Sequence, residues 1–186
     1  MSDFKKNLEE FKNTISTLSQ KEKSINLIAQ KLVKFCKNKN SKILVCGNGG
    51  SATDADHFVT ELVIRFKKNR KALPALSLSS NPGLITACAN DYSFKFIFKR
   101  QLEALANKND CIIFISTSGN SDNIIEAAKY AKKNKIYSIA LSGKKGGKLS
   151  NLCNQSFIVE SDSVARIQEV HIFLLHYFCE VIDNNF

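Results

Sequence analysis

The sequence predicts an α/β fold: a three-layer αβα sandwich with a five-stranded parallel sheet, preceded by N-terminal helices. Five short apolar runs, which we expect to be strands, alternate with stretches of helical pattern; they lie at 42–46, 73–79, 111–116, 136–141 and 156–160. Such alternation favours a parallel sheet with helices on both faces. The runs at 42–46 and 111–116 carry consecutive apolar residues, which is typical of strands buried on both faces.

The N-terminal segment, residues 1–40, is expected to be helical and to pack on the sheet or on a neighbouring subunit. Its apolar residues recur at helical spacing in two series, interrupted at Gln20 and Lys21: Phe4, Leu8, Phe11, Ile15 and Leu18, then Ile25, Ile28, Leu32 and Phe35. A chain of 186 residues is long enough for one buried core. We therefore expect a single domain over residues 1–186.

Three further helices are expected at 52–66, at 123–133 and from about Val164 to Ile182. The last of these is apolar on almost every side, and such a helix must be buried on most of its faces. At the end of so short a chain, a second subunit is the economical partner for it. We therefore expect a homo-oligomer.

Composition and charge exclude several classes of function. We find no apolar leader typical of a signal peptide, and the apolar run at 172–178 is too short to span a bilayer. The six cysteines form no C-x-x-C pair, which is typical of a reducing compartment. Ten lysines and four acidic residues in 1–42 account for +6 of the net charge of +10, without a nucleic-acid-binding signature. We expect a cytoplasmic protein with no nucleic-acid or membrane partner, and we interpret the basic stretch 143–147 as a plain turn.

Two loops of small polar residues follow the strands at 42–46 and 111–116, each directly before a predicted helix. They are Gly-Asn-Gly-Gly-Ser at 47–51 and Ser-Thr-Ser-Gly-Asn-Ser at 116–121. Free N–H groups and the helix dipole favour an anion at a helix N-terminus, so the second loop is a candidate phosphate site. A helix cap without a ligand is the alternative. Neither loop matches a dinucleotide fingerprint or a Walker loop, so no nucleotide cofactor is expected.

All three histidines lie in two of the predicted helices, each time beside a carboxylate or an amide. His57 and Glu61 are four residues apart and share one helix face. The last helix carries Gln168, His171 and His176. A lone helical histidine is more often a core residue than a ligand, but two such helices make a shared polar or metal site an equal alternative.

Taken together, these motifs resemble those of the sugar isomerase (SIS) domain family. The matching positions, in chain order, are 46–51, Asp54, His57, Glu61, Gly83, Asn90, Asp91, 116–121, 166–171 and His176. The serine-rich loop alone marks the wider family, whereas His57 and Glu61 combined with Gln168 and His176 are similar to its heptose branch. The resemblance covers the chain from about residue 1 to its end and implies a single SIS domain with a flavodoxin-like fold.

The resemblance implies an aldose–ketose isomerase that converts sedoheptulose 7-phosphate to D-glycero-D-manno-heptose 7-phosphate, the first step toward ADP- or GDP-heptose. Lipopolysaccharide, a capsule and a glycoprotein stay open as the destination of the heptose. Such a reaction moves a proton through an enediolate, so it needs a base, an acid and a group that stabilises an oxyanion. The implied acid/base pair is Glu61 and His176. The implied sugar-phosphate contacts are Asn48, Gly49, Gly50, Ser51, Glu61, Asn90, Asp91, Ser116, Thr117, Ser118, Ser121 and Gln168.

The resemblance also implies one zinc ion per active site, held by His57, Glu61, Gln168 and His176. Eight helical positions separate Gln168 from His176, a rise of about 12 Å, and the side chains of one helix all tilt the same way. This pair would converge on one ion only with difficulty. We hypothesise that Gln168 and His176 of one site come from different subunits of a homotetramer, with active sites at the subunit interfaces.

Two alternatives stay open on the sequence. A non-enzymatic SIS module that binds a phosphosugar or a replication-initiator protein would share the fold without needing Glu61, Gln168 and His176. An isomerase for another phosphosugar, such as arabinose 5-phosphate, usually carries additional domains, for which 186 residues leave no room.

Overall fold

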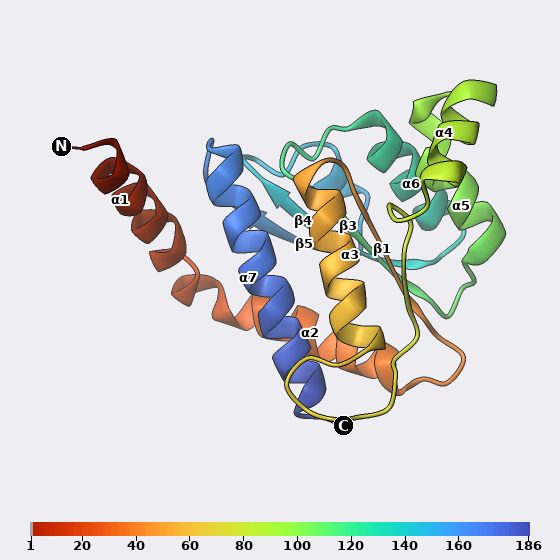
Figure 1. The fold of residues 1–186 in the computed structure, drawn as a ribbon, viewed down its shortest axis with the longest axis horizontal. Coiled ribbons are helices and arrows are strands. Elements are labelled where there is room, and N and C mark those ends of the chain that lie inside the picture. The colour runs from red at the N-terminus through yellow and green to blue at the C-terminus, as the bar shows by residue number, and fades with distance from the viewer. Residues whose placement is uncertain (1) are drawn as a thin grey trace.

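The fold was analysed in a computed structural model, which describes residues 2–186. Five parallel strands form one sheet in the order β2-β1-β3-β4-β5 (Figure 1). The strands are β1 (Ile43–Gly47), β2 (Ala75–Ser77), β3 (Cys111–Ser116), β4 (Tyr137–Gly143) and β5 (Gln155–Val159). The helices are α1 (Asp3–Ser16), α2 (Glu22–Lys37), α3 (Gly50–Val63), α4 (Pro82–Asp91), α5 (Ile97–Leu105), α6 (Asp122–Lys133) and α7 (Val164–Asp183). The predicted three-layer α/β architecture is confirmed.

The central strands are apolar throughout because both of their faces are covered. In β1, Ile43 and Val45 belong to one apolar cluster, whereas Leu44 and Cys46 belong to the other. Successive side chains of a strand point to opposite faces of the sheet, so each cluster receives every second residue. Every residue of β1 and of β3 is buried, as the non-alternating pattern predicts.

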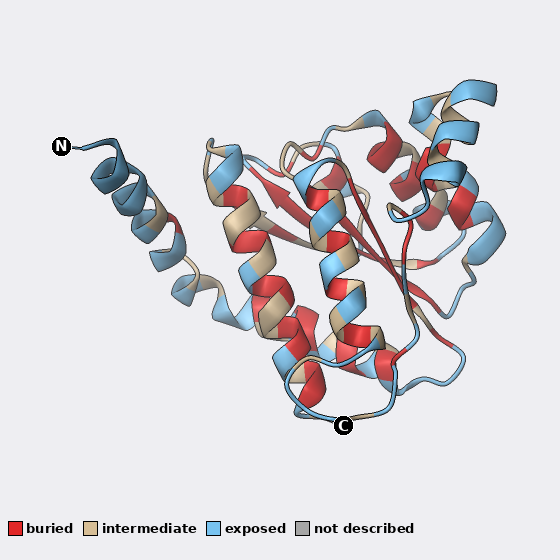
Figure 2. Ribbon diagram, in the orientation of Figure 1, coloured by how far each residue is buried: buried red, intermediate tan, exposed pale blue. Residues whose placement is uncertain are grey.

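The sheet lies between two layers of helices. Helices α2, α3 and α7 cover one face of the sheet, and α5 and α6, with α4 at their edge, cover the other (Figure 1). Buried residues line the inner side of each layer (Figure 2). None of the helices within residues 2–186 is long and apolar enough to cross a membrane.

The two helices of the N-terminal segment differ in how they pack. Helix α2 packs on the sheet and buries Ile25, Ile28 and Leu32, among others, which is one of the two packings predicted for this segment. Helix α1 projects away from the body (Figure 1), and Thr14 is its one buried residue. Its apolar residue Phe4 is 74% exposed. The apolar stripe of α1 therefore has little to pack against within this chain.

The apolar last helix, by contrast, is largely buried by its own chain. Ile167, Leu174 and Phe178 of α7 are fully buried in the cluster that α7 shares with α2, α3 and the sheet. Burial of α7 therefore does not by itself require a second subunit, which corrects the reason we give for an oligomer. Phe173, 55% exposed, and Val164, 49% exposed at the start of the helix, are the large apolar residues of α7 that stay exposed.

Candidate active site

The serine-rich loop joins β3 to α6, at the carboxyl edge of the sheet. Its own backbone satisfies two of its hydroxyl oxygens: the Gly119 N–H donates to Ser116 Oγ (3.2 Å) and the Asn120 N–H donates to Ser118 Oγ (3.1 Å). The hydroxyl hydrogens of both serines stay available as donors. Ser121 is the N-cap of α6, but its side chain makes no capping bond. The loop thus presents hydroxyl donors at a helix N-terminus, where an anion is stabilised.

The loop after β1 is tied by a pair of amides to the first turn of α6, which directly follows the serine-rich loop. Asn48 Nδ2 donates to Asn123 Oδ1 at 2.9 Å, and Asn123 Nδ2 donates back to Asn48 Oδ1 at 2.8 Å. Asn123 is only 2% exposed. We predict Asn48 as a substrate contact, but sequence reasoning misses Asn123, because nothing local marks it as the partner of a residue 75 positions away. The amide pair fixes the two loops relative to each other.

The basic stretch at 143–147, which we interpret as a plain turn, is a turn that packs against the serine-rich loop. A Cβ atom on Gly119 would lie 2.1 Å from the carbonyl oxygen of Gly146, and one on Gly147 would lie 2.5 Å from that of Gly119. The backbone of 143–148 therefore packs directly against the serine-rich loop. The Lys148 N–H also donates to Asn120 Oδ1 at 3.0 Å. This turn supports the candidate phosphate site from one side.

A second cluster of polar side chains lies where α3 packs against α7. His57 Nε2 is 3.1 Å from Glu61 Oε1 and 3.3 Å from His176 Nε2. The two imidazole rings meet edge to face, with centroids 4.9 Å apart. Both helices begin at the carboxyl edge of the sheet, but Glu61 lies eleven residues after the start of α3 and His176 twelve residues after the start of α7. These offsets are rises of about 17 and 18 Å, so within one chain the predicted acid/base pair lies toward the far ends of the helices and not beside the loops. We call this cluster of His57, Glu61 and His176 the seam.

Two separations between donor atoms of the seam are close to those between the ligands of one zinc ion. A neutral imidazole nitrogen either donates or accepts a hydrogen bond, so His57 Nε2 cannot serve a carboxylate and a second imidazole equally. Ligand atoms bound to one tetrahedral zinc lie roughly 3.3 Å apart, close to the separations found here. Burial, and secondly His57, lower the pKa of His176 while Glu61 opposes them, which favours the neutral, ligating form. Within residues 2–186, however, no group of three or more His, Cys, Asp or Glu side chains is placed to hold a metal by itself.

Gln168 lies at a different point of the same helix pair. A Cβ atom on Gly50 would lie 2.6 Å from Gln168 Nε2, so Gln168 rests against the first turn of α3. His176 contacts His57, seven residues further along α3, which is a rise of about 10 Å. Within one chain the structure brings His57, Glu61 and His176 together but leaves Gln168 apart from them.

The remaining predicted residues divide between the loops and another layer. Ser51 lies in the first turn of α3 and is 3% exposed. Asn90 and Asp91 end α4, in the layer opposite to α3 and α7, and the Asn90 amide donates to the Asp91 carboxylate at 2.8 Å. The structure does not bring these two residues to the seam. His171 is not part of the seam either: it is fully buried, its pKa is lowered to about 4 by burial, and it donates to the Ser142 carbonyl.

Asp54 of α3 is a position to which the sequence analysis assigns no role. Asp54 precedes His57 by one turn, and its Oδ2 atom is buried with no hydrogen-bond partner among the described residues. Burial raises the pKa of this carboxyl, and His57 opposes the shift. Residues three and seven apart share a helix face, so Asp54 lies on the face that carries His57 and Glu61.

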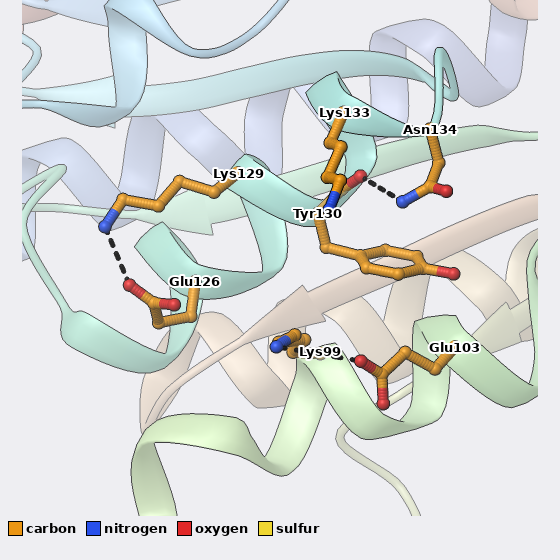
Figure 3. Close-up of a pocket in the computed structure, with 7 residues that line it drawn as sticks. All are labelled: Lys99, Glu103, Glu126, Lys129, Tyr130, Lys133 and Asn134. Carbon is orange, nitrogen blue, oxygen red and sulfur yellow. Dashed lines mark hydrogen bonds and ion pairs between the residues drawn. The ribbon is translucent and has the colours of Figure 1, made fainter.

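A separate hollow of about 290 Å³ lies between α5 and α6, away from both clusters (Figure 3). Its charged side chains pair with one another: Lys129 Nζ is 2.8 Å from Glu126 Oε1, and Lys99 Nζ is 3.7 Å from Glu103 Oε1. Exposed pairs of this kind leave little charge for a ligand, so we assign no site here.

Comparison with known proteins identifies the class to which this fold and site belong. Residues 6–143 match the model of the SIS domain family. A phosphoheptose isomerase of Campylobacter jejuni is 50% identical over 158 residues, which is 85% of each chain. One of Helicobacter pylori is 43% identical over 99% of this chain and 94% of its own.

The similarity extends to a solved structure. The structure of a phosphoheptose isomerase from Francisella tularensis superposes with a TM-score of 0.89 at 36% identity, and the match covers 99% of this chain and 100% of the other. The chain belongs to the SIS domain family and, within it, to the phosphoheptose isomerases.

Proposed function

We propose that this protein converts sedoheptulose 7-phosphate to D-glycero-D-manno-heptose 7-phosphate. The observation that carries the proposal is the seam: His57 lies within hydrogen-bonding distance of both Glu61 and His176, on two helices that pack side by side. Phosphosugar-binding modules without activity need the loop but not the seam.

In the proposed reaction the loops hold the phosphate and the seam moves the proton. Hydroxyls of Ser116, Thr117, Ser118 and Ser121 bind the phosphate. Glu61 takes a proton from one carbon of the sugar, and His176 delivers a proton to the neighbouring carbon or its oxygen, so that the substrate passes through an enediolate. Burial is the main cause that lowers the pKa of His176. Its imidazolium form, once it has received a proton, is therefore a stronger acid than ordinary imidazolium and suits the delivery step.

We propose zinc as the cofactor, one ion per active site, with His57, Glu61, Gln168 and His176 as its ligands. A bound zinc ion would supply positive charge that polarises the substrate carbonyl. The donor atoms and their spacing support this assignment. Gln168, which rests against Gly50 and not in the seam, would reach the ion of a neighbouring subunit.

We further propose that the protein is a homotetramer whose active sites lie at subunit interfaces. Two features of the described chain support an oligomer. The stripe of apolar residues on α1 is exposed, and a hollow of about 490 Å³ between α1 and α7 is lined by Phe11, Ile15, Leu18 and Phe173 among others. A second copy of the chain would cover both.

The proposed setting is the cytoplasm, where the product would enter the supply of ADP- or GDP-heptose for lipopolysaccharide, a capsule or a glycoprotein. A non-enzymatic SIS module that binds a phosphosugar or a replication initiator is the alternative, and one assay separates the two. Purified protein with added zinc is incubated with sedoheptulose 7-phosphate, and the product is followed by ¹H NMR. Appearance of the aldoheptose 7-phosphate supports the proposal, whereas binding without conversion favours the alternative.

A further inference from the structure

The loop between α3 and β2, residues 64–74, is fastened to the end of α7 by a buried ion pair. Asp183, the last residue of α7, accepts the N–H groups of Lys67 (2.8 Å) and Lys68 (3.0 Å) at Oδ2 and Arg70 Nε (2.8 Å) at Oδ1. The side chains of Arg70 and Asp183 are 3% and 2% exposed. A buried carboxylate with three donors holds its partners in one arrangement, because losing any of them leaves a buried group unsatisfied.

The same arginine also binds the last turn of α3. Arg70 Nη2 donates to the carbonyl oxygen of Glu61 and Nη1 to that of Leu62, both at 2.8 Å. The last carbonyls of a helix have no partner within the helix, so Arg70 supplies one. Through this contact the turn that carries Glu61 is connected to the end of α7.

The loop reaches the seam through an aromatic ring. The phenyl ring of Phe66 stacks on the imidazole of His176, with centroids 5.7 Å apart and an interplanar angle of 18°. His57 meets the same imidazole edge to face. The ring of His176 is therefore held between one aromatic ring from α3 and one from the loop. Lys67, whose N–H donates to Asp183, immediately follows Phe66 in the chain, so the contact with Asp183 also restrains Phe66.

We infer that residues 64–70 form a positioning element for the isomerase: Phe66 orients the His176 imidazole, and the Arg70–Asp183 pair fixes the turn that carries Glu61. The inference rests on the proposed function. Proton transfer requires acid and base at a defined separation, and misplacement of a reacting group by about 1 Å can cost as much as a hundredfold in rate. Phe66, Arg70 and Asp183 act through His176 and Glu61.

The test compares three variants of the full-length, zinc-loaded protein. Phe66→Leu removes the stacked ring, Phe66→Tyr keeps it, and Asn69→Ala alters an exposed side chain of the same loop. We expect Phe66→Leu to lower kcat about tenfold with KM within about twofold, since the ring positions a reacting group and does not bind the phosphate. Phe66→Tyr and Asn69→Ala should keep the kcat of the unaltered protein.

A second measurement does not depend on turnover. In protein treated with a chelator, the nuclear Overhauser effect between the ring protons of His176 and His57 reports the position of the His176 imidazole, since the two rings meet edge to face. We expect this effect to weaken in Phe66→Leu and to change little in Asn69→Ala, with both variants folded by circular dichroism. Arg70→Lys, which cannot reproduce the forked contacts, should also lower kcat.

The outcomes separate this inference from the proposed function. An unaltered protein that fails to convert sedoheptulose 7-phosphate would remove the function, while the NMR comparison would still show whether Phe66 orients His176. Unchanged kcat and an unchanged Overhauser effect between His176 and His57 in Phe66→Leu would overturn the inference even in an active enzyme. Loss of kcat without a change of that Overhauser effect would overturn it as well.

Discussion

The two loops and the seam are built in different ways, although both lie on elements that start at the same edge of the sheet. The loops are complete within one chain: the amides of Asn48 and Asn123 bind each other, and the backbone of 143–148 packs against Gly119. The seam is incomplete: His57, Glu61 and His176 face one another, and Gln168 lies elsewhere on the helix pair. We expect the loops to determine which ligand binds and the seam to determine whether it reacts.

This difference has a physical cause. A phosphate can be bound by hydroxyl and backbone donors that one strand–loop–helix unit supplies on its own. A cluster of carboxylate and imidazole groups forms only where separate elements pack side by side, as α3 and α7 do at the contact between His57 and His176. Substitutions in the loops and in the seam should therefore have separable effects on binding and on turnover.

Loss of the base should have the largest effect. Glu61→Gln keeps the shape of the side chain but removes the proton acceptor, and general acid–base catalysis contributes roughly a hundredfold to ten-thousandfold. We expect kcat to fall by at least about a hundredfold with an unchanged circular dichroism spectrum and oligomer size. Near-normal turnover would remove Glu61 from the mechanism.

Breaking the amide pair should weaken binding more than turnover. Asn123→Ala leaves Asn48 without its partner and frees the Ile124 N–H that Asn123 Oδ1 caps at 2.9 Å. Loss of a buried hydrogen-bond partner costs about 1–3 kcal/mol, so we expect a lower Tm and a KM raised about tenfold with kcat little changed. Steady-state kinetics and thermal unfolding measure both quantities. A selective loss of kcat would contradict the division of roles between the loops and the seam.

The Arg70–Asp183 pair predicts a pH dependence of stability. Burial alone would raise the pKa of the Asp183 carboxyl, but the N–H groups of Lys68 and Lys67 and then Arg70 outweigh it and hold the pKa below its ordinary value. Its stabilising contribution is therefore complete above the unfolded pKa of about 3.9 and is lost as pH falls through the lower folded value.

The check is thermal unfolding of the unaltered protein and of Asp183→Asn at several pH values. We expect the variant to be less stable near pH 7 by about 3 kcal/mol, typical of breaking a buried pair, and the gap between the two proteins to narrow below about pH 4. A gap that stays constant on acidification would show that Asp183 contributes nothing as a carboxylate.

Filling the space at Gly50 should have the smallest effect. Gly50→Ala places a methyl group 2.6 Å from Gln168 Nε2, which is too close for the side chain to stay where it is. The contact is with the end of a flexible side chain, so Gln168 can move away. We expect stability within about 1 kcal/mol of the unaltered protein and a few-fold loss of activity. Unchanged activity would argue against any role for the position of Gln168.

Local sequence patterns predict which elements the fold contains, but they predict the ends of some strands less accurately. The apolar runs at 42–46 and 111–116 locate β1 and β3 to within one residue, since strands buried on both faces carry an unmistakable pattern. The run at 73–79 predicts a longer strand than the observed Ala75–Ser77. An edge strand pairs on one side only, so less of the apolar run is held in the sheet.

The site could be predicted only where a motif is local. The two loops and the His57–Glu61 pair each lie within a few residues of sequence. The contact between His57 and His176 spans 119 positions and that between Arg70 and Asp183 spans 113. Such contacts depend on how helices pack side by side, and no spacing within the sequence reports that packing.

The claim that one site takes Gln168 and His176 from different subunits can be tested by complementation. Gln168→Ala and His176→Ala are each expected to be inactive, and the two variants are then co-expressed and purified as mixed oligomers. If one site uses both subunits, random mixing restores about a quarter of the sites in a symmetric oligomer, and activity returns to that level. Mixed oligomers as inactive as either variant alone would place both residues of each site in one chain and contradict the claim.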